Sequence, residues 1–190
     1  MTIGVLALQG AVREHVASLS KLGIDSRCVK TAEDLEGLSG LILPGGESTA
    51  ISLLADERFL GQLRHLARTG FPMFGTCAGM ILLASGIEDQ ASVYIGGIDI
   101  TVARNASGRQ VDSFETILDI KGIGNDVVAV FIRAPYITHY GATVQTMASH
   151  NGQCVMAREN NILVASFHPE LTEDTRVHEY FVEMVNESKT

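Results

Sequence analysis

The chain has 190 residues, of which 46% are hydrophobic and 19% are charged, and its mean hydropathy is +0.19. This length and composition predict a globular protein with a full hydrophobic core and a single domain over residues 1–190. The formal net charge of −8 at pH 7 argues against nucleic acid or an anionic membrane as the main partner, because both require a basic surface.

The cysteines and the first residues bear on the compartment. Cys28, Cys77 and Cys154 are far apart and form no Cys-x-x-Cys pair, which is typical of a cytoplasmic protein. The apolar run at 3–8 lacks the basic flank of a signal peptide and is too short to span a membrane. No His, Cys or Asp cluster has metal-ligand spacing, so neither a metal nor a cofactor is expected.

The first half of the chain alternates strand and helix patterns. Strands are predicted at 2–8, 26–30, 41–43 and 71–75, of which those at 2–8 and 41–43 are expected to be buried. Helices are predicted at 12–22, from residue 31, and at about 49–68 with a break near residue 56. This alternation predicts an α/β fold, a three-layer sandwich in which helices flank a central, mostly parallel sheet.

After about residue 86 the pattern changes to short strands joined by Gly and Asn turns. These strands are predicted at 98–102, 111–120, 127–132, 143–147, 154–158 and 162–167. They are expected to form an antiparallel extension of the sheet. An amphipathic pattern over 175–186 predicts a final helix with its apolar side facing the core.

A cysteine stands between two glycines where a predicted strand meets a predicted helix, in Gly75-Thr76-Cys77-Ala78-Gly79. Glycines admit the sharp turn of a nucleophile elbow, and the start of the next helix favours a thiolate. Taken alone, the pattern would favour a buried structural cysteine, so the interpretation depends on its neighbours.

A base and its orienting group occur at another strand end, in Ser166-Phe167-His168-Pro169-Glu170. Residues two apart in a strand share a face, so Glu170 is expected to reach the ring of His168. A thiolate nucleophile needs such a base, and ligands of α/β sheets bind where parallel strands end. The predicted triad is therefore Cys77, His168 and Glu170.

Other strand-end and histidine positions are less specific. Gly45-Gly46 could present backbone N–H groups to an anion, although a plain turn explains the pair equally well. His65, His139 and His178 lie on stretches without obvious partners, and each is expected to be an ordinary surface or core residue.

Together these segments resemble the class I (triad) glutamine amidotransferases over essentially the whole chain. Within them the similarity is to the branch that supplies ammonia for pyridoxal 5′-phosphate synthesis. The segments that carry the resemblance are Leu-Gln-Gly-Ala-Val-Arg-Glu-His at 8–15, Leu-Pro-Gly-Gly-Glu-Ser-Thr at 43–49, Phe-Gly-Thr-Cys-Ala-Gly at 74–79, Arg-Asn at 104–105, Gly-Arg-Gln at 108–110, Ser-Phe-Glu at 113–115, Phe-Ile-Arg-Ala-Pro at 131–135 and Ser-Phe-His-Pro-Glu at 166–170.

The resemblance implies a role for each residue of the triad. Cys77 attacks the side-chain carboxamide of glutamine, His168 passes a proton to the departing ammonia, and Glu170 holds His168. The backbone N–H groups of Gly46 and Ala78 hold the oxyanion.

The resemblance also implies a glutamine pocket and a partner. The binding residues are Gly46, Glu47, Ser48, Arg104, Ile132 and Arg133. A cation such as Arg104 suits the α-carboxylate of glutamine, and Glu47 suits its α-ammonium group, although a solvated strand edge would explain Arg104, Arg109 and Arg133 equally well. The expected partner is the synthase subunit of pyridoxal 5′-phosphate synthase, in a hetero-oligomer in which docking activates the glutaminase.

The roles of four residues stay open, as do three alternative functions for the chain. Gln9 and His15 belong to the partner interface or the oxyanion site, or His15 is an ordinary exposed helix residue, and the roles of Arg109 and Gln110 are undetermined. The alternatives are a deglycase-type cysteine hydrolase, a glutaminase serving another synthase such as that for anthranilate, and a degenerate assembly module. The first usually has His after the nucleophile, where this chain has Ala78.

Overall fold

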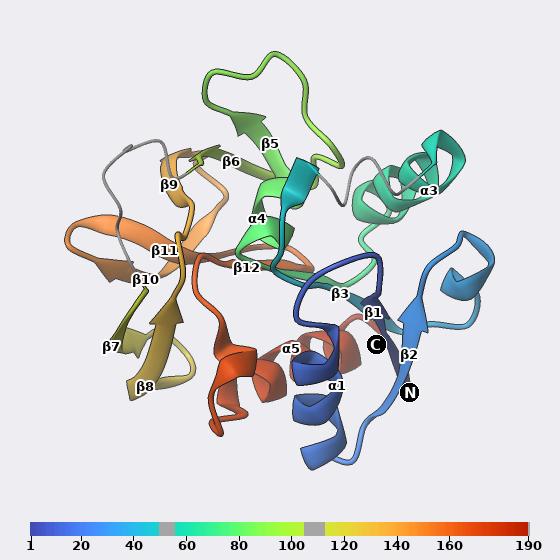
Figure 1. Cartoon of the computed structure of the whole chain (residues 1–190), viewed down its shortest axis with the longest axis horizontal. Helices are drawn as coiled ribbons and strands as arrows, with labels where there is room; N and C mark the ends of the chain where they lie inside the picture. Colours follow the sequence, from blue (N-terminus) through green and yellow to red (C-terminus); the bar gives the residue numbers. More distant parts are fainter. Residues whose placement is uncertain (50–55, 105–112, 190) are drawn as a thin grey trace.

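A computed structural model of the chain describes residues 1–49, 56–104 and 113–189 (Figure 1). Its helices are α1 (Val12–Lys21), α3 (Glu57–Arg68), α4 (Ala78–Leu83) and α5 (Arg176–Glu187), with 3-10 turns η1 (Glu33–Leu35) and η2 (Pro169–Leu171). Its strands are β1 (Thr2–Leu6), β2 (Asp25–Val29), β3 (Gly40–Leu43), β4 (Met73–Thr76), β5 (Ala84–Ile87), β6 (Ile98–Ala103), β7 (Phe114–Ile120), β8 (Gly124–Phe131), β9 (Tyr136–Tyr140), β10 (Gln145–His150), β11 (Gln153–Glu159) and β12 (Ile162–Ala165).

One large sheet organises the described part of the chain, with strand order β2-β1-β3-β4-β12-β11-β9-β6-β5 and β10 paired to β11. The pairs from β2 to β12 are all parallel. Antiparallel pairs then link β12, β11, β9 and β6, and β5 joins β6 in parallel. The predicted α/β class, with a mostly parallel sheet and an antiparallel extension, is confirmed.

The hairpin β7–β8 corrects one part of that prediction. These two strands form a separate antiparallel sheet instead of extending the central one. The reason is packing, because their inward side chains join the core that α5 also covers, among them Leu118, Val127 and Phe131. Residues 111–112, where the first of these strands is predicted to begin, lie outside the described residues.

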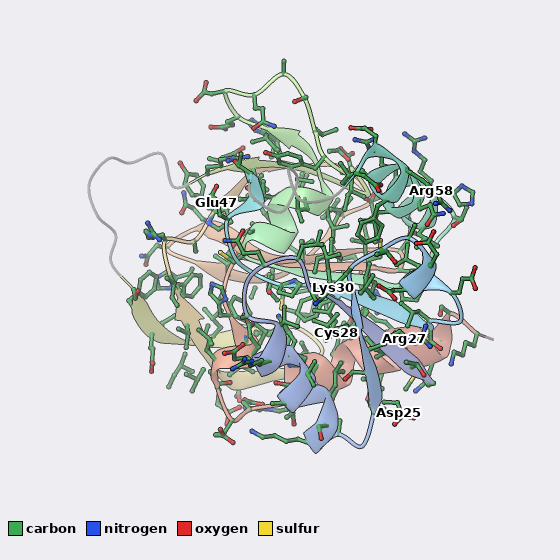
Figure 2. The ribbon with its side chains drawn as sticks, turned by 45° about the vertical axis from the view of Figure 1, so that its right-hand side comes forward. Asp25, Arg27, Cys28, Lys30, Glu47 and Arg58 are labelled. Carbon is green, nitrogen blue, oxygen red and sulfur yellow. The ribbon has the colours of Figure 1, made fainter. Side chains whose placement is uncertain are left out.

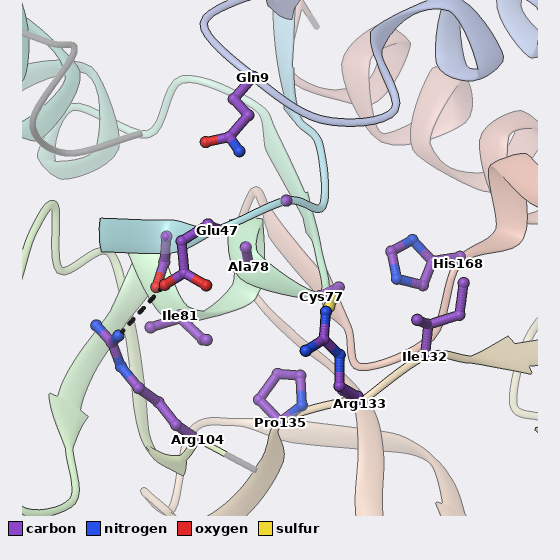
Figure 3. Close-up of a pocket in the computed structure, with 12 residues that line it drawn as sticks. Gln9, Glu47, Cys77, Ala78, Ile81, Arg104, Ile132, Arg133, Pro135 and His168 are labelled. Carbon is purple, nitrogen blue, oxygen red and sulfur yellow. Dashed lines mark ion pairs between the residues drawn. The ribbon is translucent and has the colours of Figure 1, made fainter. Parts of the chain in front are cut away.

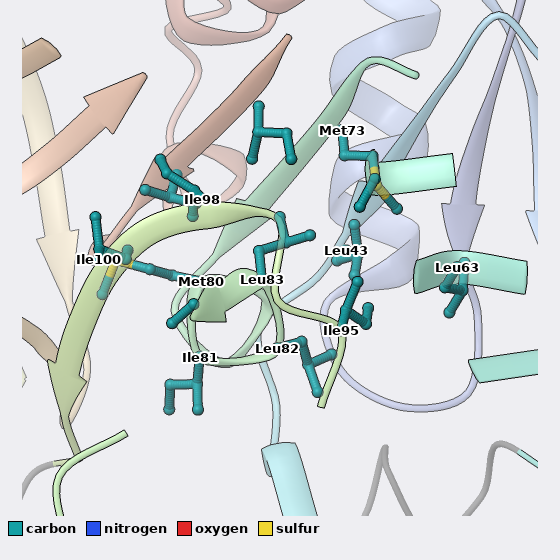
Figure 4. Packing of buried hydrophobic residues seen from close by; sticks show 14 of the residues in the cluster. Leu43, Leu63, Met73, Met80, Ile81, Leu82, Leu83, Ile95, Ile98 and Ile100 are labelled. Carbon is teal, nitrogen blue, oxygen red and sulfur yellow. The ribbon is translucent and has the colours of Figure 1, made fainter. Parts of the chain in front are cut away.

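Alternate residues of the central strands enter two different cores. Ile42 and Phe74 face α1 and α5, whereas Leu43 and Met73 face α3 and α4 (Figures 1 and 4). These four side chains are fully buried, and burying each contributes about 1.5–3 kcal/mol. Helices therefore cover both faces of the sheet, which confirms the predicted three layers.

Helix α3 starts where the sequence predicts a break. The Asp56 carboxylate accepts a hydrogen bond from the backbone N–H of Phe59 at 2.6 Å and caps the helix. The preceding part of the predicted helical stretch, at 50–55, lies outside the described residues.

The sheet ends at the polar edge strand β2, where Asp25, Arg27 and Cys28 are exposed (Figure 2). Charged side chains at an edge discourage pairing with another strand. Arg27 also donates to the backbone carbonyl of Glu36 at 2.7 Å, which ties η1 to this edge. Among the described residues, no helix has the length and apolarity needed to cross a bilayer.

Candidate active site

The predicted elbow is present at Cys77, between the last residue of β4 and the first of α4. Cys77 has φ 49° and ψ −108°, a left-handed backbone that non-glycine residues rarely adopt. Its N–H donates to the carbonyl of Ala165 on β12 at 2.8 Å, which ties the turn to the neighbouring strand. The strain therefore resides in the cysteine itself.

The flanking glycines permit close approach and do not supply the unusual φ angle. A Cβ at Gly75 would lie 2.5 Å from the backbone carbon of Gly79, and a Cβ at Gly79 would lie 1.9 Å from the carbonyl oxygen of Leu43. Any side chain at either position would push α4 away from β3 and β4. The Gly-x-Cys-x-Gly pattern thus reflects the packing of α4 onto the sheet.

The predicted base, His168, and its predicted carboxylate partner meet in the turn after β12. His168 Nδ1 donates to Glu170 Oε1 at 2.7 Å, and the Glu170 side chain is fully buried. Glu170 belongs to η2, so the predicted contact is made through a 3-10 turn that begins at Pro169, and not across the face of a strand. The N–H of His168 donates to the carbonyl of Val130 at 2.8 Å and fixes this turn against β8.

The charge state of His168 follows from its neighbours. Burial alone disfavours its positive charge, but interactions with Cys77 and Glu170 outweigh burial and raise the pKa of His168 to about 10. At neutral pH the ring is therefore an imidazolium ion. An imidazolium beside a thiol is the arrangement that stabilises a thiolate nucleophile.

Cys77 and His168 open onto a pocket of about 520 Å³ (Figure 3). All six predicted glutamine-binding residues and Ala78 line it with them; the further lining residues are Gln9, Ile81 and Pro135. Glu170 lies behind His168, out of the pocket. The structure thus brings together residues that lie as far apart in the sequence as Gln9 and His168.

The carboxylate of Glu47 and the guanidinium of Arg104 face each other across 3.9 Å in this pocket. Arg104 also donates to Thr49 Oγ1 at 2.9 Å, to Gln90 Oε1 at 3.2 Å and to the Tyr94 hydroxyl. Gln90 and Tyr94 carry no sequence motif, so their support of Arg104 could not be recognised before the fold was known.

The turn at residues 9–10 packs directly on the Gly-Gly segment. A Cβ at Gly10 would lie 1.5 Å from the carbonyl oxygen of Gly45, so only glycine allows this contact. Gly46 has φ 146°, which L side chains rarely adopt. Gln9 thereby reaches the pocket wall, beside the segment that carries the candidate oxyanion donor.

The structure corrects the expected exposure of His15 and the expected lack of partners for His178. His15 and His178 are fully buried, and His15 Nδ1 lies 2.9 Å from His178 Nε2. The interpretation of His15 as an exposed helix residue and of His178 as partnerless is therefore wrong. His65 and His139 are exposed, as ordinary surface residues are. Arg109 and Gln110 lie outside the described residues, as do the rest of the 105–112 motifs.

The fold and the cysteine elbow define the class I glutamine amidotransferase type. The chain matches a crystal structure of a glutamine amidotransferase with a TM-score of 0.91 and 44% identity, covering 97% of this chain and 98% of that one. A structure of PurLQS from Thermotoga maritima, at 14% identity and a TM-score of 0.69, covers 100% of this chain and 99% of that one and shares the fold.

The family follows from the sequence match. Residues 5–187 match the SNO glutamine amidotransferase family, and the chain belongs to that family. A relative from Bacillus cereus (strain AH187), named pyridoxal 5′-phosphate synthase subunit PdxT, is 55% identical over 188 residues, which cover 98% of this chain and 96% of the relative. A Bacillus cytotoxicus protein of the same name is 54% identical over the same coverage.

Proposed function

We propose that this chain is a cytoplasmic, single-domain glutaminase that hydrolyses L-glutamine to L-glutamate and ammonia for the synthase subunit of pyridoxal 5′-phosphate synthase. The observation that carries the proposal is the buried pair of His168 and Glu170, 2.7 Å apart, beside Cys77 at the wall of a ligand-sized pocket. The names of the relatives from Bacillus support the choice of partner.

In the first half-reaction, the Cys77 thiolate attacks the carboxamide carbon of glutamine. The carbonyl oxygen becomes an oxyanion that accepts hydrogen bonds from the backbone N–H groups of Gly46 and Ala78. His168, an imidazolium ion at neutral pH, then gives its proton to the departing nitrogen. Ammonia leaves, a thioester remains on Cys77, and the ring of His168 is neutral.

In the second half-reaction, neutral His168 takes a proton from water as the water oxygen attacks the thioester. The same two N–H groups hold the second oxyanion. The carbon–sulfur bond breaks, the product leaves as the side-chain carboxylic acid and loses its proton to water to give glutamate, and the thiolate and imidazolium are restored. Glu170 keeps the ring of His168 in one orientation throughout.

The remaining side chains of the pocket bind the two charged groups on the α-carbon of glutamine. The α-carboxylate of glutamine binds Arg104 and its α-ammonium group binds Glu47, so the substrate separates a pair that is 3.9 Å apart without it. Ser48, Ile132 and Arg133 complete the pocket wall. Gln90 and Tyr94 hold the guanidinium in place, which lowers the ordering cost of binding.

Ammonia is lost as a nucleophile once it is protonated in bulk water, so the glutaminase docks on the subunit that uses it, and docking raises its activity. The test is glutamate release from glutamine by the purified chain, alone and with a pyridoxal 5′-phosphate synthase subunit. Strong activation by the subunit is expected, and Cys77→Ser should abolish release without unfolding the chain. Cys28→Ser, at the exposed edge strand, is the matched control and should behave as wild type.

The proposed reaction would be contradicted if the chain released no glutamate, both alone and with the synthase subunit. Release that is equally fast without the synthase subunit would keep the reaction and remove the activation by docking. Near-normal release by Cys77→Ser would remove Cys77 as nucleophile.

A further inference from the structure

Behind the triad lies a second polar cluster that the proposed reaction does not use. His15 on α1 is completely buried, and its Nε2 lies 3.6 Å from Glu170 Oε2 and 3.2 Å from Thr76 Oγ1. Its Nδ1 lies 2.9 Å from Nε2 of His178 on α5, the helix beside α1 (Figure 1). A chain of polar groups therefore runs from α5 through α1 to the outer oxygen of Glu170.

Both histidines are neutral near pH 7. Burial, followed by the positive charges that His178 and His168 can carry, holds the pKa of His15 well below its ordinary value. Burial lowers the pKa of His178 to about 4. A neutral imidazole has one N–H donor and one acceptor nitrogen, so the hydrogen bond between the two rings can run in only one direction at a time.

The surroundings select that direction. His178 Nδ1 is buried without a hydrogen-bond partner in the described part of the chain, so a proton there would be an orphaned donor. The opposite arrangement places the proton on His178 Nε2, which donates to His15 Nδ1. His15 must then carry its own proton on Nε2, where the N–H lies between Thr76 Oγ1 and the carboxylate of Glu170.

Glu170 needs such a donor. Its Oε1 accepts from His168, whereas Oε2 is buried and has no hydrogen bond of ordinary length among the described residues. A carboxylate held at one oxygen only can rotate about its last side-chain bond and release the ring that it orients. Catalytic hydrogen bonds are often long before substrate binds, so a separation of 3.6 Å is compatible with this role.

We propose that His15, with its tautomer set by His178, is a positioning residue that holds Glu170 Oε2 and thereby keeps Oε1 on the ring of His168. The inference rests on the proposed triad. His15 does not line the pocket, and it acts only through Glu170.

Steady-state glutamine hydrolysis by the chain with its synthase subunit tests this role. His15→Leu should lower kcat by about 10- to 100-fold, the usual effect of removing a group that orients a functional side chain, and should leave KM within about twofold. His15→Gln should recover most of the activity, because its amide nitrogen can occupy the place of Nε2. His178→Leu should lower kcat less, and His178→Gln should recover it.

Leu19→Ala is the matched control, since Leu19 is equally buried on α1 but packs in the apolar core. It should destabilise the chain and leave kcat near wild type at temperatures where the variant is folded. Wild-type kcat in His15→Leu would overturn the inference, as would equal losses in His15→Leu and His15→Gln. Cys77→Ser, measured in parallel, tests the proposed triad separately from the role of His15. Activity in that variant would contradict the triad itself.

The tautomers give a readout that does not depend on any variant folding. Long-range ¹H–¹⁵N correlations of the ¹⁵N-histidine-labelled full chain distinguish a protonated from an unprotonated ring nitrogen. The expected result is a proton on Nε2 of both His15 and His178. A proton on His15 Nδ1 would point the lone pair of Nε2 at Glu170 and would contradict the proposed role.

Discussion

Gly45→Ala should disable the triad without disturbing the backbone. Gly45 does not have a positive φ, so alanine fits its conformation. A Cβ there would lie 2.4 Å from Cε1 of His168, 3.1 Å from its Nδ1 and 3.3 Å from Cβ of Cys77. Ordinary contacts begin near 3.4 Å, so the ring of His168 must move by about 1 Å.

A displacement of about 1 Å at a reacting group can lower the rate about 100-fold, which corresponds to roughly 2.7 kcal/mol of transition-state stabilisation. We therefore expect Gly45→Ala to lower kcat for glutamine hydrolysis by about 100-fold and to leave KM nearly unchanged. The assay is glutamate release by the chain in complex with the synthase subunit, with thermal unfolding measured on the same preparations.

Gly61→Ala is the matched control, because Gly61 lies within α3 and a Cβ there would meet nothing within 4 Å. It should keep wild-type kinetics and gain about 0.5–1 kcal/mol of stability. The contact with His168 should also make Gly45→Ala less stable than wild type, and in a His168→Ala background that destabilisation should largely vanish, since the ring that it meets is gone. A wild-type kcat in Gly45→Ala would refute the placement of His168 in the reaction.

Three further predictions test other parts of the structure. Arg133 lines the pocket and is exposed, so Arg133→Ala should raise KM for glutamine by about tenfold without unfolding the chain. Because residue 133 has φ 42°, Arg133→Gly should raise KM equally but be about 1 kcal/mol more stable than Arg133→Ala by chemical denaturation. A loss of folded protein in either variant would make Arg133 a structural residue instead. Gly79→Ala would bring a Cβ to 1.9 Å from a backbone oxygen of Leu43, so the free energy of unfolding in urea should fall by about 3 kcal/mol, and an unchanged value would contradict the packing of α4. The pKa of His178 is lowered from 6.5 to about 4 in the native chain. Between these two pH values the unfolded chain therefore takes up a proton at residue 178 that the native chain does not. The free energy of unfolding should fall by roughly 3 kcal/mol from this group as pH falls from 6.5 to 4. His178→Leu should flatten that dependence in denaturation curves recorded at several pH values, and equal slopes for both chains would contradict it.

The placement of Cys77, His168 and Glu170 near one another could be predicted from sequence because its signals are local. Cys77 lies in a strand-glycine-helix pattern, and His168 and Glu170 are two positions apart. The rule that ligands bind at the ends of parallel strands then joins the two segments. The physical reason for the glycines could be recognised only in the structure. Position 79 must be glycine because it packs against the backbone of Leu43 on another strand, and not because of its own φ angle.

The contacts of His15 and His178 could not be predicted, because the two residues are 163 positions apart and each lies in an ordinary amphipathic helix. Nothing in either helix indicates that a polar side chain on its buried side has a partner across the interface. The same holds for Tyr94, which binds Arg104 from a segment without regular pattern.

The hairpin β7–β8 illustrates a different limit. The sequence correctly predicts its two strands, and the structure shows that each has one buried face. The pattern does not say whether that face joins the edge of the central sheet or packs on top of it, and here it packs beside α5. Strand pairing over long sequence separations is decided by tertiary packing, and local propensity carries no information about that packing.

The role of Cys77 as the nucleophile is tested most directly by the site of covalent labelling with a glutamine analogue that carries an electrophilic carbon in place of the carboxamide. The full chain, in complex with its synthase subunit, is incubated with the analogue, and its peptides are analysed by mass spectrometry. One adduct is expected, on Cys77, that excess glutamine suppresses and that is absent in Cys77→Ser. An adduct on the exposed Cys28 alone, or labelling of Cys77 that glutamine does not suppress, would contradict that role.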